Sequence, residues 1–339
     1  MNIRPLLASP LPGMCAETRT TRACDATSRV CIGSPSSVRT ASLGLLIAGL
    51  LATGMLHAAT PIDETRSLDA NADVSLSNVK GRIAVSVWDR PEIHIGGSLG
   101  DGVKALEIEG SGGKVEVSVR YPDSSGWFGL GGGNNAAESE LLVKVPAGVA
   151  LSVDGVSADI EVRGVAGRTL RINSVSGDVQ ASSDADDIDI DNVSGDVSLD
   201  ARSQIVSLES VSGDVSLTGD VSREISVKSV SGDVQVQSGT ALRKVTAGVV
   251  SGDIELALSL SAGARLRAES LSGDLELVLP ASTSARLKAS SFTGTLRSDA
   301  GSVVKPEHGP GSKLEAVLGG GDGQIDVETF SGDLRIRLQ

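Results

Sequence analysis

The sequence has almost no aromatic residues and a deficit of positive charge, and each shortage excludes a class of protein. Aromatic side chains make up 2% of the 339 residues. A globular core of this size normally uses bulky rings to fill its centre, so the shortage favours a thin core built from Val, Ile and Leu. The formal net charge of -13 argues against a nucleic-acid partner, because phosphate binding requires a basic face.

Cysteine and histidine are also scarce. Cys15, Cys24 and Cys31 all precede residue 32, so the rest of the chain offers neither disulfides nor thiolate metal sites. After residue 59 the only histidines are His94 and His308, far apart in the sequence, and no Gly-x-Ser-x-Gly elbow occurs. We therefore predict a protein without a catalytic site, a cofactor or a metal centre.

The sequence has one long apolar run, from Leu43 to Leu56. It is uncharged, too short to span a membrane comfortably, and followed by the small residues Ala58 and Ala59. This pattern predicts a secretory signal peptide with cleavage near these alanines, a retained membrane anchor being the alternative. We interpret residues 1–37, which are unusual for such a segment, as an extension upstream of the true start. The chain is thus expected to be exported to the periplasm or cell surface, with no stable membrane span after cleavage.

A repeat dominates the remainder. Ser-Gly-Asp occurs seven times, and two looser copies, Ser157-Ala158-Asp159 and Thr293-Gly294-Thr295, extend the series. Successive copies start 18 to 21 residues apart, and the last gap, of 38 residues, equals two periods. A fixed period of this size indicates one supersecondary unit stacked many times. The seven copies start at residues 176, 194, 212, 231, 251, 272 and 331.

Apolar residues form columns when the copies are aligned on this tripeptide. We predict that each coil has a strand before the corner, with core columns represented by Ile190 and Val193, and a strand after it, with core columns represented by Val197 and Leu199. At the corner Gly takes a positive φ, and the Ser and Asp side chains bond nearby backbone N–H groups. A further column is expected to form a ladder of stacked hydroxyls: Ser174, Ser210, Ser229, Ser270 and Ser291.

The repeat predicts an all-β fold, a right-handed parallel β-solenoid (β-helix) with coils of about 18–21 residues and an irregular N-terminal β cap. A left-handed β-helix, which needs an aliphatic residue every six positions, and antiparallel hairpins with Ser-Gly at each tip are the alternatives. We assign residues 1–59 to the signal peptide and its extension, 60–148 to the cap and first strands, and 149–339 to the repeat array. The array is expected to be interrupted by a loop at 300–311.

The last copy of the repeat predicts how the array ends. The final copy runs to the end of the chain through Leu334 and Leu338, with Arg335 and Arg337 between the apolar positions. Alternate arginines discourage edge-to-edge pairing of an exposed strand. We therefore predict that this segment forms the last coil and protects its open edge.

Two places where the repeat fails or concentrates charge are candidate sites. The Gly-rich loop around Trp127 and Phe128 is interpreted either as an excursion packed on the cap or as an exposed contact loop. The coil with Asp184, Asp186, Asp187, Asp189 and Asp191 is strongly acidic, and some β-helices cleave glycans with clustered carboxylates. The equivalent outward positions of neighbouring coils carry Arg171, Ser207 and Ser226. We expect no set of Arg, Lys or His side chains to converge on the aspartates, so we favour a solvated face.

One aspartate per corner gives a column that could bind a line of divalent cations, because Ca²⁺ takes carboxylate ligands. We favour a structural role for the column, since a backbone hydrogen bond at each corner offsets the repulsion of about 0.9 kcal/mol between charges one coil apart. The candidate calcium ligands are Asp178, Asp196, Asp214, Asp233, Asp253 and Asp274.

These motifs resemble a family of exported bacterial proteins with a β-strand repeat, which are called "putative adhesins" and carry the name domain of unknown function 4097. The resemblance rests on the Val-Ser-Gly-Asp-Val copies, on residues 85–90 and 145–148, on Leu279-Pro280-Ala281, and on Thr329-Phe330-Ser331-Gly332-Asp333. It implies a β-helical fold and an envelope or surface setting, with no general catalytic signature.

The sequence therefore predicts a non-enzymatic, adhesin-like scaffold whose partner is an envelope protein or a glycan. The alternatives are a glycan-active β-helix, with Asp189 as the residue to test, and a periplasmic partner in envelope-stress sensing, which rests on family analogy.

Overall fold

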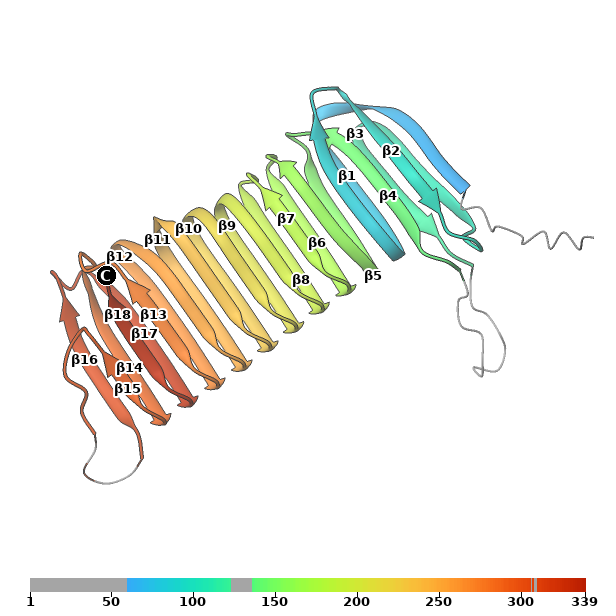
Figure 1. Ribbon diagram of the computed structural model, residues 1–339. Helices are drawn as coiled ribbons and strands as arrows, with labels where there is room; N and C mark the ends of the chain where they lie inside the picture. The colour runs from blue at the N-terminus through green and yellow to red at the C-terminus, as the bar shows by residue number, and fades with distance from the viewer. Residues whose placement is uncertain (1–59, 123–135, 306, 308–309) are drawn as a thin grey trace, which may run out of the picture. The chain divides into compact units, whose positions relative to one another are not determined.

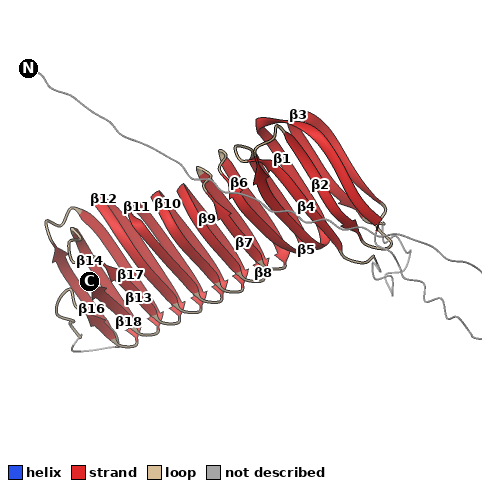
Figure 2. Ribbon diagram, turned by 45° about the horizontal axis from the view of Figure 1, so that its top comes forward, coloured by secondary structure: helices blue, strands red, loops and turns tan. Residues whose placement is uncertain are grey.

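The computed structural model describes residues 60–122, 136–305, 307 and 310–339, all within one compact unit that comprises residues 55–339. The described residues form strands, turns and bends (Figure 2). This described part of the chain has no helix that is long and apolar enough to cross a membrane. The predicted signal peptide and the loop with Trp127 and Phe128 lie outside the described residues.

The strands fall into three groups along the chain (Figure 1). The first group comprises β1 (Thr60–Trp88), β2 (Glu92–Leu99), β3 (Ala105–Arg120) and β4 (Ser139–Pro146). The second comprises β5 (Ala150–Val165), β6 (Thr169–Ser176), β7 (Val179–Ser183), β8 (Asp187–Ser194), β9 (Val197–Ser212), β10 (Val215–Ser231), β11 (Val234–Ser251) and β12 (Ile254–Ser272). The third comprises β13 (Leu275–Leu279), β14 (Ala285–Thr293), β15 (Leu296–Ser298), β16 (Ser312–Leu318), β17 (Gly323–Ser331) and β18 (Leu334–Leu338).

The repeat array is a parallel β-solenoid. Each coil pairs in parallel with the coils before and after it, and the register advances by one repeat: Val197 is opposite Val215, which is opposite Val234. Among the described strands, the antiparallel pairs are β1–β2, β2–β4 and β14–β16, all near the two ends. The predicted solenoid is therefore confirmed, and the alternative of antiparallel hairpins does not describe the array.

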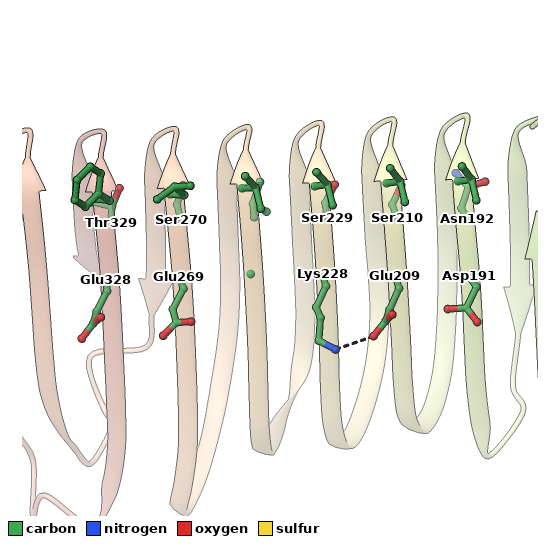
Figure 3. Close-up of a pocket in the computed structure, with 18 of the residues that line it drawn as sticks. Asp191, Asn192, Glu209, Ser210, Lys228, Ser229, Glu269, Ser270, Glu328 and Thr329 are labelled. Atoms are coloured by element: carbon green, nitrogen blue, oxygen red, sulfur yellow. Dashed lines mark hydrogen bonds and ion pairs between the residues drawn. The ribbon is translucent and has the colours of Figure 1, made fainter. Parts of the chain in front are cut away.

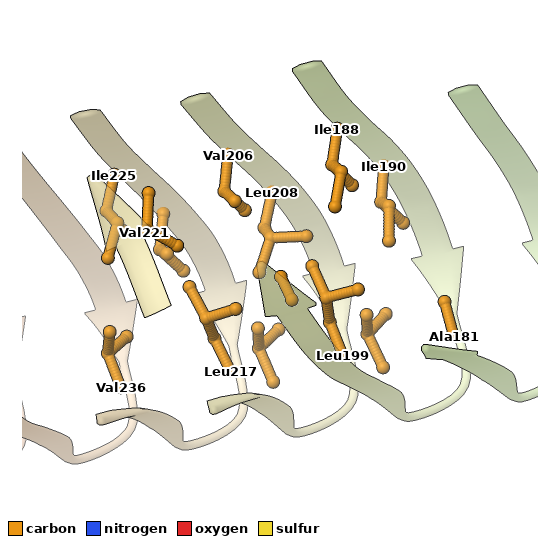
Figure 4. Packing of buried hydrophobic residues seen from close by; sticks show 14 of the residues in the cluster. Ala181, Ile188, Ile190, Leu199, Val206, Leu208, Leu217, Val221, Ile225 and Val236 are labelled. Carbon is orange, nitrogen blue, oxygen red and sulfur yellow. The ribbon is translucent and has the colours of Figure 1, made fainter. Parts of the chain in front are cut away.

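Each coil has two walls that face one another across a thin core. We call the wall before the Ser-Gly-Asp corner the first wall, and the wall after it the second wall. In Figure 4, Ile188 and Ile190 of a first wall lie opposite Ala181 and Leu199 of the second walls, and all four side chains are buried. Burial of one such aliphatic side chain contributes about 1.5–3 kcal/mol. Three of the four predicted core columns, those of Ile190, Val197 and Leu199, are confirmed.

The fourth predicted core column is wrong. Val193 and its equivalents point outward and are 45–53% exposed from coil to coil. Strand alternation explains the difference, because Ile190 points inward and period two then places Asn192 inside and Val193 outside. The residue before this valine, Asn192 or a serine in most coils, takes the inward position instead.

The corners stack more closely than a side chain would allow. The corner glycines have positive φ, as predicted, for example 117° at Gly232. In addition, a Cβ built on Gly232 would lie 2.2 Å from the carbonyl oxygen of Gly213 in the preceding corner. Backbone conformation and coil spacing therefore both require glycine here.

At the N-terminal end, spatial order differs from sequence order. The coil of β1 lies between β5 on one side and β3 and β4 on the other: Leu76 is opposite Val153 and also Val117, and Val85 is opposite Val162 and also Val143. The start of β1 pairs antiparallel with β2, which pairs in turn with β4. The first coil in sequence is thus the second coil of the stack.

The C-terminal end repeats this arrangement. β17 pairs in parallel with both β12 and β14, and β18 with both β13 and β15. The last coil in sequence is therefore inserted between two coils that precede it. The predicted role of the β18 arginines as guards of an open edge is wrong for Arg335, which is paired with Glu276 on one side and Arg297 on the other. Arg337 is paired with Val278 alone. The outermost described strand on the first wall is β16, antiparallel to β14.

Candidate interaction groove

An exposed apolar row runs along the outer face of the first wall. It consists of the column of Val193, which was predicted to be buried, and each neighbouring coil contributes one residue to it. Ten side chains at about 4.8 Å per coil give a row of roughly 43 Å. Its members, in spatial order, are Val79, Val156, Val175, Val193, Val211, Val230, Val250, Leu271, Phe330 and Phe292.

The apolar row increases in side-chain size toward the C-terminal end. Valine is followed by Leu271 and then by two phenylalanines that come from strands far apart in the sequence. The rings of Phe330 and Phe292 are stacked, with centroids 4.8 Å apart and planes 11° from parallel. Offset aromatic pairs at such distances contribute about 0.5–1.5 kcal/mol beyond their burial. The inserted coil therefore builds the aromatic end of the row.

A second outward row, which we call the polar row, lies two residues before the apolar row. Its members, in spatial order, are Asp154, Asn173, Asp191, Glu209, Lys228, Gly248, Glu269 and Glu328. Figure 3 shows Asp191, Glu209, Lys228, Glu269 and Glu328 in line along the array, with the coil of Gly248 between Lys228 and Glu269. The Nζ of Lys228 lies 2.7 Å from Oε1 of Glu209, and Arg267 pairs with Glu269.

Together the two rows line a groove of about 1260 Å³. The groove extends from Ser77 and Asp154 to Phe292 and the segment Pro310–Lys313, which line its other end. Five carboxylates line it, against the two lysines Lys228 and Lys313. The groove is therefore apolar along one side and acidic along the other.

Asp191 is the carboxylate of the groove whose pKa is shifted. Partial burial raises its pKa above the ordinary value, the Asp189 and Glu209 carboxylates raise it further, and Arg171 lowers it. A raised pKa in the folded state means that ionised Asp191 opposes folding above that pKa. The folded protein then gains stability as the pH falls from the raised pKa toward the ordinary one.

Asp191→Asn is therefore expected to raise the free energy of unfolding at pH 7. Because the side chain is exposed, solvent screening limits the gain to no more than about 1 kcal/mol, and the gain should vanish below pH ~3.9, the ordinary pKa of aspartate. Urea denaturation between pH 4 and pH 8 measures it. Asp200→Asn, on the second wall, is the matched control. A variant that is less stable than the parent at pH 7 would contradict the assignment.

The aspartates of the corner form a continuous hydrogen-bonded ladder. The backbone N–H of Asp233 donates to Oδ1 of Asp214 at 2.9 Å, and the N–H of Asp253 donates to Oδ1 of Asp233 at 2.8 Å. The predicted backbone bonds are thus present, but they join successive coils and are not local to one corner. The ladder joins, in order, Asp159, Asp178, Asp196, Asp214, Asp233, Asp253, Asp274, Asp333 and the N–H of Thr295.

The ladder bears on the calcium hypothesis. Each candidate ligand already accepts a backbone N–H with one oxygen, which is a strong, charge-assisted bond. Within the described residues, no group of three or more His, Cys, Asp or Glu side chains is placed to hold a metal ion. Calcium binding by this column stays the untested alternative to the structural role.

The serines predicted to stack at the corner lie in register from coil to coil, with Ser210 opposite Ser229. The serines of that column are buried, as are Asn192 and Thr329 at equivalent positions. Some members of the column donate to backbone carbonyls at the corner: Ser291 Oγ donates to Gly332 O at 3.1 Å, and Asn192 Nδ2 to Gly195 O at 2.6 Å. Among the described residues, Ser174 Oγ and Ser210 Oγ have no hydrogen-bond partner.

The acidic coil is spread over two places. Asp187, Asp189 and Asp191 point outward from β8, while Asp184 and Asp186 lie in the bend before it. The expectation that no basic group converges on them is wrong. Arg171 Nε lies 3.4 Å from Asp189 Oδ2, and Arg202 approaches Asp184 at 3.9 Å. These exposed ion pairs are typical of a solvated face.

The groove was not predicted from the sequence, although strand alternation indicates it. Alternation counted from the buried Ile190 assigns Val193 to the outside, and the same count assigns the polar row to the same face. The alignment on Ser-Gly-Asp instead treated every apolar column as core.

Comparisons with known proteins extend these findings. The family model described as Toastrack DUF4097 matches residues 72–337. No curated protein matches the chain. Solved structures to which the chain is similar include those of three bacterial proteins.

The first is a "putative lipid binding protein" from Parabacteroides distasonis, 14% identical, with 82% of this chain and 96% of that chain covered and a TM-score of 0.46. The second is a "putative adhesin" from Bacteroides fragilis, 12% identical, with 83% and 98% covered and a TM-score of 0.39. The third is a "putative cell adhesion protein" from Clostridium sporogenes, 13% identical, with 83% and 100% covered and a TM-score of 0.22.

Proposed function

We propose that this chain, which belongs to the Toastrack DUF4097 family, is a non-catalytic, adhesin-like interaction scaffold of the cell envelope or cell surface. The observation that supports this proposal best is the apolar row, ten side chains long and about half exposed along most of its length. Large contiguous apolar patches on a soluble protein mark interaction sites. The export expected from the segment at 43–59 is part of the proposal.

The solenoid itself does not require the apolar row. The equivalent outward column on the second wall is polar, with Gln180, Ser198, Ser216, Gln235 and Glu255 in successive coils. These coils pair with the same register as the first wall. Outward valine is therefore dispensable for stacking, which favours a role in binding.

The test is a variant with Val193→Ser, Val211→Ser and Val230→Ser. Cells that carry it are expected to lose most of their attachment to surfaces coated with envelope protein or envelope glycan. The fold should persist, because half-exposed side chains contribute little to the core. Ser198→Ala with Ser216→Ala and Gln235→Ala, on the second wall, is the matched control.

Attachment that is equal in the triple variant and the parent would overturn the proposal. The compartment is tested separately, by protease treatment of intact cells. Cleavage in intact cells supports a surface position, and cleavage only after the outer barrier is opened supports the periplasm. Recovery of the chain in the cytosol would contradict export.

A further inference from the structure

The groove has a chemical asymmetry that specifies its partner. The apolar row and the polar row run parallel over most coils of the array, and each coil contributes one residue to each row. A partner that lies along the groove therefore contacts apolar side chains on one flank and carboxylates on the other. The five carboxylates exceed the two lysines along the whole length.

We infer that the groove binds a cationic amphipathic segment of a partner protein, with its apolar face on the apolar row and its Lys or Arg side chains over the polar row. This inference rests on the proposed function and names the partner chemistry for the same groove. At 1.5 Å per residue, roughly 29 residues of helix would span the row of about 43 Å. Recognition of an amphipathic segment by an apolar groove is a common mode of peptide binding.

The charges disfavour two other occupants. A second copy of this chain that packed its apolar row on this apolar row would bring the two acidic polar rows close together, and like charges across an interface oppose association. An anionic membrane surface would meet the same repulsion, since such surfaces attract basic segments. A cationic partner gains from both rows.

Substitution of Lys228 tests the inference, because it is expected to make the partner bind more tightly. Lys228 is the lysine in the middle of the polar row and it neutralises Glu209. Lys228→Gln removes one positive charge and leaves that carboxylate available to the partner. A purely structural role for the rows would not predict tighter binding from the loss of an ion pair.

The experiment uses the folded chain and three probes: an amphipathic peptide of Leu and Lys in a helical pattern, a Leu and Glu peptide of the same pattern, and vesicles of anionic phospholipid. The Leu and Lys peptide is expected to bind, more weakly as salt rises. Val211→Ser with Val230→Ser should weaken it at least about tenfold. Asp191→Asn with Glu328→Gln should weaken it about five- to tenfold, and Lys228→Gln should tighten it about two- to fivefold.

Several results would overturn the inference. These are equal binding of the Glu peptide, no binding of the Lys peptide, binding that the row variants do not change, or preferential binding of the anionic vesicles. The failure of the inference can be distinguished from that of the proposed function. If the triple valine variant abolishes cell attachment while the Lys peptide does not bind, the groove is functional and its partner has another chemistry. If attachment is unchanged, the proposed function itself fails.

Discussion

Gly232→Ala is expected to lower the free energy of unfolding by several kcal/mol. An L-residue at a φ of 117° is strained by about 1–2 kcal/mol. The added Cβ would also lie 2.2 Å from Gly213 O and 2.6 Å from Gly213 C. Because both atoms are backbone, relief requires the two corners to separate, and overpacking of this kind adds about 1–3 kcal/mol.

Two other glycines distinguish the cost of backbone strain from the cost of the close contact between corners. Gly263 has a φ of 75°, and no described atom lies within 4 Å of the position that an added methyl group would take, so Gly263→Ala tests backbone strain alone. Gly248 has no described neighbour within 4 Å of that position and no positive φ, so Gly248→Ala should be neutral or slightly stabilising. Denaturant unfolding of the three variants should give the order Gly232, Gly263, Gly248 in decreasing loss. Equal losses for Gly232→Ala and Gly263→Ala would show that the corners do not contact as closely as described.

Deleting residues 320–339 is expected to unfold more than the deleted segment. β17 and β18 contribute the buried side chains Ile325, Val327, Leu334 and Ile336, which together represent roughly 6–12 kcal/mol of hydrophobic burial. Both strands are interior, so the deletion also removes the parallel partners of β14 and β15. Hydrogen exchange should therefore show loss of protection over residues 285–318 as well.

A deletion at the end of a simple stack would behave differently. Upstream strands would keep their protection, because each would retain its preceding neighbour. Persistent protection of β14 in the shortened chain would thus contradict the inserted position of the last coil. Val317→Ser is the matched control on β16, where the side chain is 66% exposed and its replacement should change little.

Local pattern predicted much of this fold. The period of the corner gave the parallel solenoid, and the columns after the corner, such as Val197 and Leu199, were assigned correctly to the core. The column of Val193 was assigned incorrectly, because hydrophobicity was given more weight than alternation. In a parallel stack, valine is a favourable strand residue on either face, so its chemistry alone does not tell which face it occupies.

The spatial order of the coils could not be predicted from the sequence, for a different reason. The gap of 38 residues between the last two copies fits two ordinary coils in sequence order equally well. Whether β17 lies beyond β14 or between β12 and β14 depends on pairing between distant segments, and residue composition within each coil is similar. The stacked Phe292 and Phe330 rings, and with them the aromatic end of the groove, therefore could not be placed from the sequence.

The corner ladder offers a rule for reading coil order that the repeat count does not. Each carboxylate is needed only where a further coil presents an N–H to it. Thr295 occupies the aspartate position in the coil of β14 and β15, where its N–H donates to Asp333 Oδ1 and no described coil follows on the second wall. At the C-terminal end, the corner copy that has lost its acid thus identifies the terminal rung, whereas at the other end Arg82 takes the aspartate position in a coil that has a neighbour on each side. In related chains, a copy without aspartate near the C-terminal end should mark the last corner of the stack.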